Sequence, residues 1–465
     1  MKKRVIFIVV TALLCCLLVA CGSKTRLQAP QNIRQNGPFL IWDEVENAEG
    51  YIVLADNEEY VTAEPSCNLS FLGGETVYVV KIKAVGDGEN FADSDWSEFG
   101  FNEIFKYTLL ADGSGYEVNL SVSSVELQDR KVVVPSTYEN LPVTRIADKM
   151  FYKCASLTEI VLPNTLKEIG ANAFYNCDAL ESIELPESVT AIGSGAFREC
   201  VALKKIVVSS GVECIAEEMF YECASLTEIV LPNTLKEIGV DAFYNCKALT
   251  SIELPESVTA IGPSAFMHCS SLKKIVVPTG IERIESNMFN DCTSLTEVVL
   301  PSMLKEIRGM AFFGCIALEN IELPASVTAI GSIAFGGCSS LKKIVVPTGV
   351  ERIEGSTFVG CSNLTEVVLP STLKEIMGMA FRKCEALKTV VLPSSLEDIG
   401  KDAFYMCPLE SVFFDGTEAE FLSVSVAEGN DSILSAAVYF YSETEPTENP
   451  QKFWRFSGGK PLPWA

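Results

Sequence analysis

The sequence of 465 residues contains a single histidine, His268, and only four tryptophans. His268 occupies a position that Lys153, Asn176 and Glu199 fill in other copies of a repeat, so we expect it on the surface. Ser-His-Asp and Cys-His mechanisms then have no general base. No acidic pair stands out from the repeated background, and "GSGYE" and "GGK" lack the strand-to-helix setting of a phosphate loop. We therefore expect no enzymatic activity.

Basic charge is also scarce. Lysine and arginine number 36 against 61 aspartates and glutamates, which gives a formal net charge of −25. Binding to nucleic acid needs a basic surface that displaces counterions from phosphates, so a nucleic-acid partner is excluded. The hydrophobic content of 48% and charged content of 21% are typical of a folded chain, and the length predicts two or three domains.

Long apolar runs are missing after the N-terminus. The segment "MKKRVIFIVVTALLCCLLVAC" has a basic start and a short apolar run, which predicts a signal peptide over residues 1–20 and not a membrane span. Its end, Leu18-Val19-Ala20-Cys21, resembles the lipobox of bacterial lipoproteins. The resemblance implies lipidation of Cys21, an anchor and linker over residues 21–26, and a membrane-anchored protein on the extracellular face of the cell. An ordinary cleaved signal that releases a soluble protein is the alternative.

No sortase motif or C-terminal span is present, so Cys21 is the only anchor that we expect.

The residues after the linker are typical of a β-sandwich. Trp42 ends an apolar run, and a later segment alternates on one face Tyr78, Val80, Ile82 and Ala84. Together with the closing "DSDWSE" around Trp96, residues 27–104 resemble a fibronectin type III domain. We expect this domain to be a spacer near the membrane, with a binding role as the alternative.

A strict 23-residue period begins at Phe151, and eleven complete units run to residue 403. The tenth and twelfth positions are aliphatic while the ninth and eleventh vary, which indicates a short strand with one buried face. One unit cannot enclose a core, but stacked units share one. The pattern F-x-x-C-x-x-L-x-x-I-x-L-P-x-x-L-x-x-I-G-x-x-A resembles the BspA-like (Treponema pallidum type) leucine-rich repeats.

The resemblance implies a mainly β protein with a leucine-rich-repeat solenoid of 23-residue coils, one parallel strand per coil. We assign residues 105–150 to an N-terminal cap and first irregular repeat, 151–407 to the array and 408–465 to a C-terminal β cap. An aromatic hairpin from Val438 to Trp464 is expected within the cap, because solenoid ends need covering. BspA-like proteins are adhesive, which implies binding to extracellular, host or bacterial surface proteins.

Twelve of the 17 cysteines recur every 23 residues, from Cys154 to Cys407. Each is flanked by a core phenylalanine and leucine, so we expect a ladder of reduced, buried, apolar thiols. Scattered disulfides are an alternative in an extracellular protein. A metal string is disfavoured because the CxxC spacing of zinc sites never occurs, and we expect no metal and no cofactor.

A longer period of 69 residues, or three coils, overlies the short one and repeats pairs of lysines about 14 Å apart on the strand face. Cross-strand pairing, such as Lys205 beside Glu228 and Lys274 beside Glu297, is one interpretation. A striped docking face is the other, and a non-catalytic envelope scaffold or spacer without a discrete ligand is the alternative function. The candidate binding residues are Lys204, Lys205, Lys273, Lys274, Lys342, Lys343, Glu184, Glu253 and Glu322.

Overall fold

The computed structural model describes residues 24–36, 39–55, 58–68, 79–100, 105–121, 131–457 and 460–464. The chain divides into two compact units, Met1–Phe99 and Gly100–Ala465. The expected signal peptide and the lipidation site at Cys21 lie outside the described residues. Nearly all regular structure is β, and no helix within the described ranges is long and apolar enough to cross a membrane.

The first unit contains a four-stranded sheet in the order β5-β4-β7-β9 and a three-stranded sheet in the order β2-β3-β6. Val80, Ile82 and Ala84 are buried on one face of β7, as their alternation predicts, and Tyr78 lies outside the described residues. The Trp42 ring packs edge-on against Tyr51 at 5.1 Å. The strands are β1 (Thr25–Arg26), β2 (Arg34–Asn36), β3 (Phe39–Ile41), β4 (Gly50–Ala55), β5 (Glu58–Thr62), β6 (Ser66–Asn68), β7 (Val79–Val85), β8 (Phe91–Ala92) and β9 (Ser97–Gly100).

The second unit begins with five strands that join the sheets of the array. Antiparallel β10 and β11 lead into β14, which pairs in parallel with the array strand β16, while β12 pairs with β15. Tyr107 and Tyr138 stack at 4.0 Å beside this junction. The strands are β10 (Phe105–Leu109), β11 (Tyr116–Leu120), β12 (Lys131–Val133), β13 (Thr137–Tyr138) and β14 (Leu141–Ile146).

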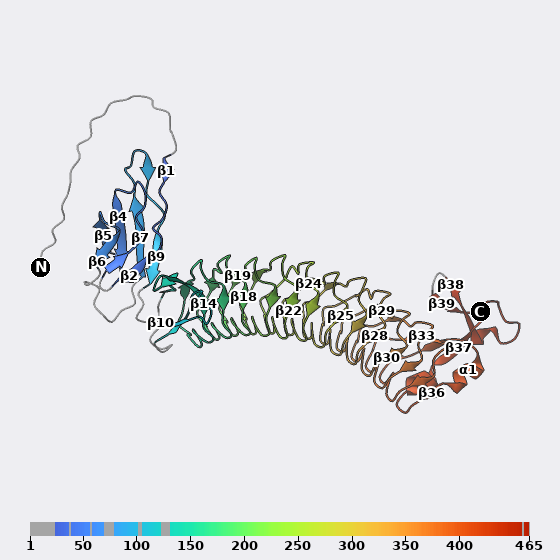
Figure 1. Cartoon of the computed structure of the whole chain (residues 1–465). Helices are drawn as coiled ribbons and strands as arrows, with labels where there is room; N and C mark the ends of the chain where they lie inside the picture. The colour runs from blue at the N-terminus through green and yellow to red at the C-terminus, as the bar shows by residue number, and fades with distance from the viewer. Residues whose placement is uncertain are drawn as a thin grey trace, which may run out of the picture. The chain divides into compact units, whose positions relative to one another are not determined.

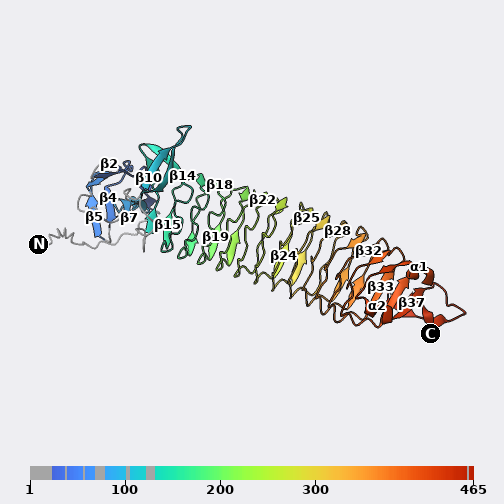
Figure 2. The same cartoon turned by 90° about the horizontal axis from the view of Figure 1, so that it is seen from below.

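Each coil of the array carries a first strand near its ninth to eleventh positions, and the coils follow one another in a single file (Figures 1 and 2). All these strands pair in parallel with the strand 23 residues away, as predicted. Coils five and eight have only isolated bridges there, at Ser251 and Asn320. The first strands are β15 (Glu159–Val161), β17 (Ser182–Ile183), β19 (Lys205–Val207), β21 (Glu228–Val230), β24 (Lys274–Val276), β26 (Glu297–Val299), β29 (Lys343–Val345), β31 (Glu366–Val368) and β33 (Thr389–Pro393).

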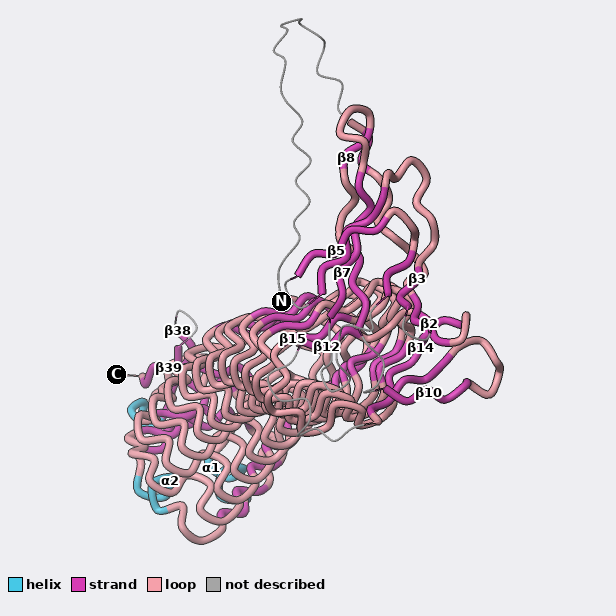
Figure 3. The backbone as a smooth tube through the Cα atoms, turned by 90° about the vertical axis from the view of Figure 1, so that its left-hand side faces the viewer, coloured by secondary structure: helices cyan, strands magenta, loops and turns pink. Residues whose placement is uncertain are grey.

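A second short strand per coil, at the eighteenth and nineteenth positions, was not predicted. Its isoleucine is buried, and backbone bonds such as Gly193 N–H to Ile169 O (2.8 Å) join neighbouring coils there as well. Figure 3 looks onto the N-terminal end of the array and shows the coils lying behind one another. The second strands are β16 (Glu168–Ile169), β18 (Ala191–Ile192), β20 (Cys214–Ile215), β22 (Glu237–Ile238), β23 (Ala260–Ile261), β25 (Arg283–Ile284), β27 (Glu306–Ile307), β28 (Ala329–Ile330), β30 (Arg352–Ile353), β32 (Glu375–Ile376) and β34 (Asp398–Ile399).

The core of the array is a continuous stack of phenylalanine rings from Phe151 to Phe404. Consecutive centroids are 5.2–5.8 Å apart, and the ring planes lie within 19° of each other. All of these rings are fully buried. Burying one phenylalanine contributes about 1.5–3 kcal/mol, so the stability of the array grows with each added coil.

The recurring cysteines form a buried ladder beside the phenylalanine stack. From Cys177 to Cys407, each thiol donates a hydrogen bond to the phenylalanine carbonyl of the preceding coil, with sulfur–oxygen distances of 3.0–3.3 Å. All described cysteines are free thiols, and those outside the ladder are Cys67 and Cys214. The position is therefore buried as expected, but it is not purely apolar, because the S–H group serves as a weak donor.

Two positions in every coil have left-handed backbone. The third position has φ of 55–71° and the twenty-second has φ of 53–64°. Asparagine, aspartate and glycine recur at both because they tolerate this conformation. Ile333, a β-branched residue with φ of 60°, is an outlier at the twenty-second position.

The expected hairpin from Val438 to Trp464 is wrong. β37 (Ala437–Tyr441) and β38 (Phe453–Ser457) pair in parallel, and only β38 and β39 (Lys460–Pro463) form a hairpin. The segment 442–452 crosses over between them, which lets the buried Trp454 donate from Nε1 to the Phe414 carbonyl at 2.9 Å. The other elements are β35 (Ser411–Asp415), α1 (Glu418–Ser423), β36 (Ser425–Val426), α2 (Asp431–Ser435) and the 3-10 turn η3 (Pro450–Lys452).

Candidate protein-binding face

The first strands present one exposed face, which we call the strand face: the side chains at the ninth and eleventh positions of the coils. Side chains alternate across a strand, so in β19 the side chains of Lys205 and Val207 are exposed while Ile206 between them is 1% exposed. The same alternation recurs in β21, β24, β29 and β31. The face therefore follows directly from the pattern of the repeat.

The ninth-position lysines are neutralised within the chain. Lys205, Lys274 and Lys343 each place Nζ 2.6 Å from a glutamate of the next coil, which are Glu228, Glu297 and Glu366. These side chains are 48–54% exposed, and such pairs contribute at most about 1 kcal/mol each. The cross-strand pairs predicted from the sequence are present, and they hold neighbouring coils in register.

The eighth-position lysines differ from one another. Lys204 pairs with Glu181 at 2.7 Å, and Lys342 pairs with Glu319 at 2.6 Å. Lys273 has no ion pair among the described residues, because Thr250 stands where the other two coils carry glutamate. Of the six candidate lysines, Lys273 is the one whose charge is available to a ligand.

The eleventh positions carry exposed valines and unpaired acids. Glu184, Glu253 and Glu322 are exposed, and within the described chain none of them has a hydrogen bond or an ion pair. Each glutamate is followed by two valines on the next two coils, and these six side chains are 42–48% exposed. The sequence analysis did not include the valines among the candidate residues, although the repeated Glu-Val-Val order was visible. They are Val207, Val230, Val276, Val299, Val345 and Val368.

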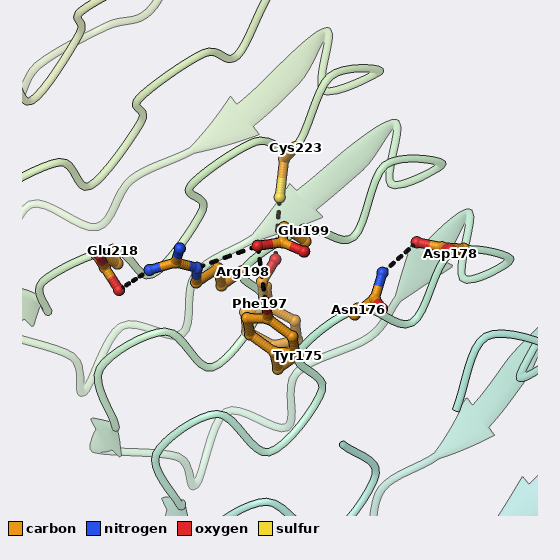
Figure 4. Close-up of polar contacts among 8 residues, drawn as sticks. All are labelled: Tyr175, Asn176, Asp178, Phe197, Arg198, Glu199, Glu218 and Cys223. Atoms are coloured by element: carbon orange, nitrogen blue, oxygen red, sulfur yellow. Dashed lines mark hydrogen bonds and ion pairs between the residues drawn. The ribbon is translucent and has the colours of Figure 1, made fainter. Parts of the chain in front are cut away.

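A second cluster lies at the second and third positions of the coils and was missed by the sequence analysis. The Tyr175 hydroxyl donates to Glu199 Oε1 at 2.8 Å, and Arg198 pairs with both Glu199 and Glu218 (Figure 4). The Arg198 guanidinium lies 4.2 Å from the centre of the Tyr221 ring. Burial lowers the pKa of Arg198, but the hydrogen bond and charge of Glu218 outweigh it and raise that pKa. The hydrogen bond to Glu199 raises the pKa of Tyr175.

This cluster is part of a ladder of stacked side chains. Tyr152 stacks on Tyr175 at 4.7 Å, Tyr221 stacks on Tyr244 at 4.5 Å, and His268 meets Tyr244 edge-on at 5.2 Å. The stacked ring faces are covered by neighbours, so we interpret the ladder as stabilising the coils and not as a platform for a ligand. The His268 side chain is 34% exposed, because it packs on Tyr244 and lies near Asp291.

No group of three or more His, Cys, Asp or Glu side chains in the described parts of the chain could hold a metal ion. The chemistry on offer is therefore that of a surface: paired charges, unpaired glutamates and exposed valines along a stack of coils. The model of the family described as "BspA type Leucine rich repeat region (6 copies)" matches residues 144–272, 213–338 and 305–424, which together exceed half of the chain.

The chain belongs to the BspA-type leucine-rich repeat family. Proteins with this kind of solenoid are typically binding scaffolds without catalytic sites, and membership points in general to protein–protein interaction or adhesion.

Three solved structures illustrate the similarity of this BspA-type chain to bacterial repeat proteins. A leucine-rich repeat protein from Bacteroides ovatus is 30% identical, covering 70% of this chain and 89% of that one, with a TM-score of 0.48. A leucine rich cell surface protein from Faecalibacterium prausnitzii is 25% identical over 71% and 98% of the two chains, with a TM-score of 0.43. A T. pallidum leucine-rich repeat protein is 29% identical over 52% and 89%, with a TM-score of 0.34. No curated protein matches this chain closely enough to count as a relative.

Proposed function

We propose that this BspA-type protein is a non-catalytic adhesin that binds other proteins through its strand face. The observation that carries the proposal is the set of six exposed valines, grouped in pairs that alternate with glutamates that have no partner in the described chain. Exposed apolar groups on a rigid surface favour a protein partner, and unpaired charges among them favour one orientation of that partner.

The partner that fits this face is an extracellular, host or bacterial surface protein with apolar side chains and basic groups. The lysines are mostly paired within the chain, so the free charge at the strand face comes mainly from Glu184, Glu253 and Glu322. The net charge of −25 adds a long-range attraction for basic partners.

The N-terminal segments supply the position of the face in this proposal. Lipidation of Cys21 anchors the chain to a membrane, and residues 27–104 act as a fibronectin type III-like spacer between the anchor and the array. The lipobox-like sequence and the two antiparallel sheets of the first unit support these roles. Intact-mass measurement of the membrane fraction tests the anchor: the wild-type chain should carry acyl groups, and Cys21→Ser should be unprocessed or released into the medium. An unlipidated wild-type chain would contradict the anchor.

The binding role is tested by capturing partners from extracellular-matrix and co-resident bacterial proteins with the full chain. The triple change of Glu184, Glu253 and Glu322 to glutamine should weaken capture, and the loss should become smaller as salt rises. The triple change of Lys205, Lys274 and Lys343 to glutamate is the matched control, because it removes ion pairs on the same strands. The control should cost about 0.2–1 kcal/mol of stability per site and leave most binding intact.

A non-catalytic envelope scaffold without a discrete ligand is the alternative function. The internal pairing of five of the six candidate lysines favours it, since a face whose charges are satisfied needs no ligand. Absence of any captured protein with the wild-type chain would support the scaffold and contradict the adhesin.

A further inference from the structure

The row of eleventh-position side chains becomes covered toward its C-terminal end. Val345 is 46% exposed and Val368 is 42% exposed, whereas Val391 is half-buried and Phe413 on β35 is only 4% exposed. Phe413 stacks on Tyr439 at 5.2 Å, and Trp454 of β38 meets it edge-on at 5.6 Å. The hairpin formed by β38 and β39 at the C-terminal end of the array (Figure 1) therefore closes over the end of the row.

A groove remains where the open row meets this hairpin, with a cavity volume of about 530 Å³. Its floor is formed by Val368, Val391 and Phe413, and the hairpin contributes Phe456 and Pro461 as a wall. The Phe456 side chain is 53% exposed although it borders the groove. A volume in this range is typical of sites that enclose a ligand group, and the other strand-face valines have no such wall.

The charges at the rim of the groove are partly unpaired. Glu366 is bound to Lys343 at 2.6 Å. Asp415 on β35 and Lys460 on β39 also line the groove, and neither has an ion pair within the described part of the chain. A cationic group next to an apolar one would meet Asp415 while its neighbour fills the space under Phe456.

We propose that this groove is an anchor site for an extended segment of a partner protein. It takes one large apolar side chain, of the size of leucine, methionine or phenylalanine, from a segment that carries lysine or arginine at an adjacent position. The apolar side chain packs between Val368, Phe413 and Phe456, and the basic group faces Asp415. The site deepens the proposed function and rests on it, since it places the tightest contact of the strand face at its C-terminal end. Central apolar anchors in pockets dominate the energy of many interfaces.

The probe is a phage-displayed library of random heptapeptides selected on the full chain. We expect enrichment of peptides with a large apolar residue adjacent to lysine or arginine. The affinity of the most enriched peptide, labelled with a fluorophore, is then measured by anisotropy against wild-type and variant chains. Phe456→Ala should weaken binding about tenfold or more. Asp415→Lys should do the same, while Asp415→Glu should retain the affinity.

Val299 provides a matched control for Val368, because it lies 69 residues earlier in the same "TEVVLP" sequence. The two side chains are 44% and 42% exposed, and only Val368 lies beside the hairpin. Val368→Lys should weaken the peptide about tenfold or more, whereas Val299→Lys should change its affinity less than about twofold. Circular dichroism of each variant confirms that the array is folded.

Three results would overturn the anchor site. The first is enrichment of no peptide, or of peptides without a basic residue beside an apolar one. The second is equal loss of affinity in Val368→Lys and Val299→Lys, which would leave the strand face as a whole as the binding surface. The third is unchanged affinity in Phe456→Ala. None of these results affects the capture of folded proteins that tests the adhesin, so the two proposals fail separately.

Discussion

The buried thiols should make the array unstable in mildly alkaline solution. Burial raises the pKa of Cys154 to about 11 and those of Cys269 and Cys361 to about 12, from an ordinary value of 9.0. Above pH 9 the unfolded chain releases these protons while the folded chain keeps them. The unfolded state then binds fewer protons, so stability falls as pH rises from about 9 toward the folded pKa values.

The size of the effect follows from the same values. Raising the pH from 8 to 10 removes about 1.4 kcal/mol for each such thiol, or about 4 kcal/mol for these three cysteines together. Burial also raises the pKa of five further ladder thiols well above the ordinary value, which adds to the loss in the same direction. These are Cys223, Cys246, Cys292, Cys315 and Cys338.

The assay is urea denaturation at pH 8 and pH 10, followed by circular dichroism with reductant present so that thiolates are not oxidised. The double variant Cys269→Ala, Cys361→Ala loses packing and is less stable at both pH values. It also lacks two titrating groups, so its drop between pH 8 and pH 10 should be smaller than that of the wild type by about 3 kcal/mol. An equal drop in the two proteins would refute the assignment of the alkaline instability to the buried thiols.

Three further changes test individual contacts by denaturant unfolding. Thr250→Glu should give Lys273 an acidic partner and add about 0.2–1 kcal/mol, and persistence of the gain in 1 M salt would argue against an ion pair. Ile333→Asn should stabilise the chain by about 0.5–1 kcal/mol by relieving a left-handed β-branched residue, so a loss would show that its packing matters more. Trp454→Phe should cost about 1–3 kcal/mol, because it removes the buried hydrogen bond to the Phe414 carbonyl. An unchanged midpoint would mean that this bond contributes nothing.

The regular part of the protein was largely predictable from its sequence. In a repeat of 23 residues, each side chain has its own counterpart in the next coil as its neighbour, so the burial of one coil applies to all. The stacked Phe151 and Phe174, the buried ladder cysteines and the pairing of Lys205 with Glu228 follow from that rule. The second strand of each coil escaped prediction because two residues are too few to show the alternation of a strand.

The irregular ends and the side-chain networks were decided by tertiary structure. Trp454 is buried because the segment 442–452 crosses over and brings it to Phe414, a contact across 40 residues that no periodicity marks. Arg198 reaches Tyr221 because side chains at the second position point along the stack, which the alternation of a strand does not reveal. A repeat determines the contacts that recur between neighbouring coils, since these depend on local spacing alone. The cover over Phe413 and the groove beside Val368 occur once, so they depend on where a non-repeating segment packs.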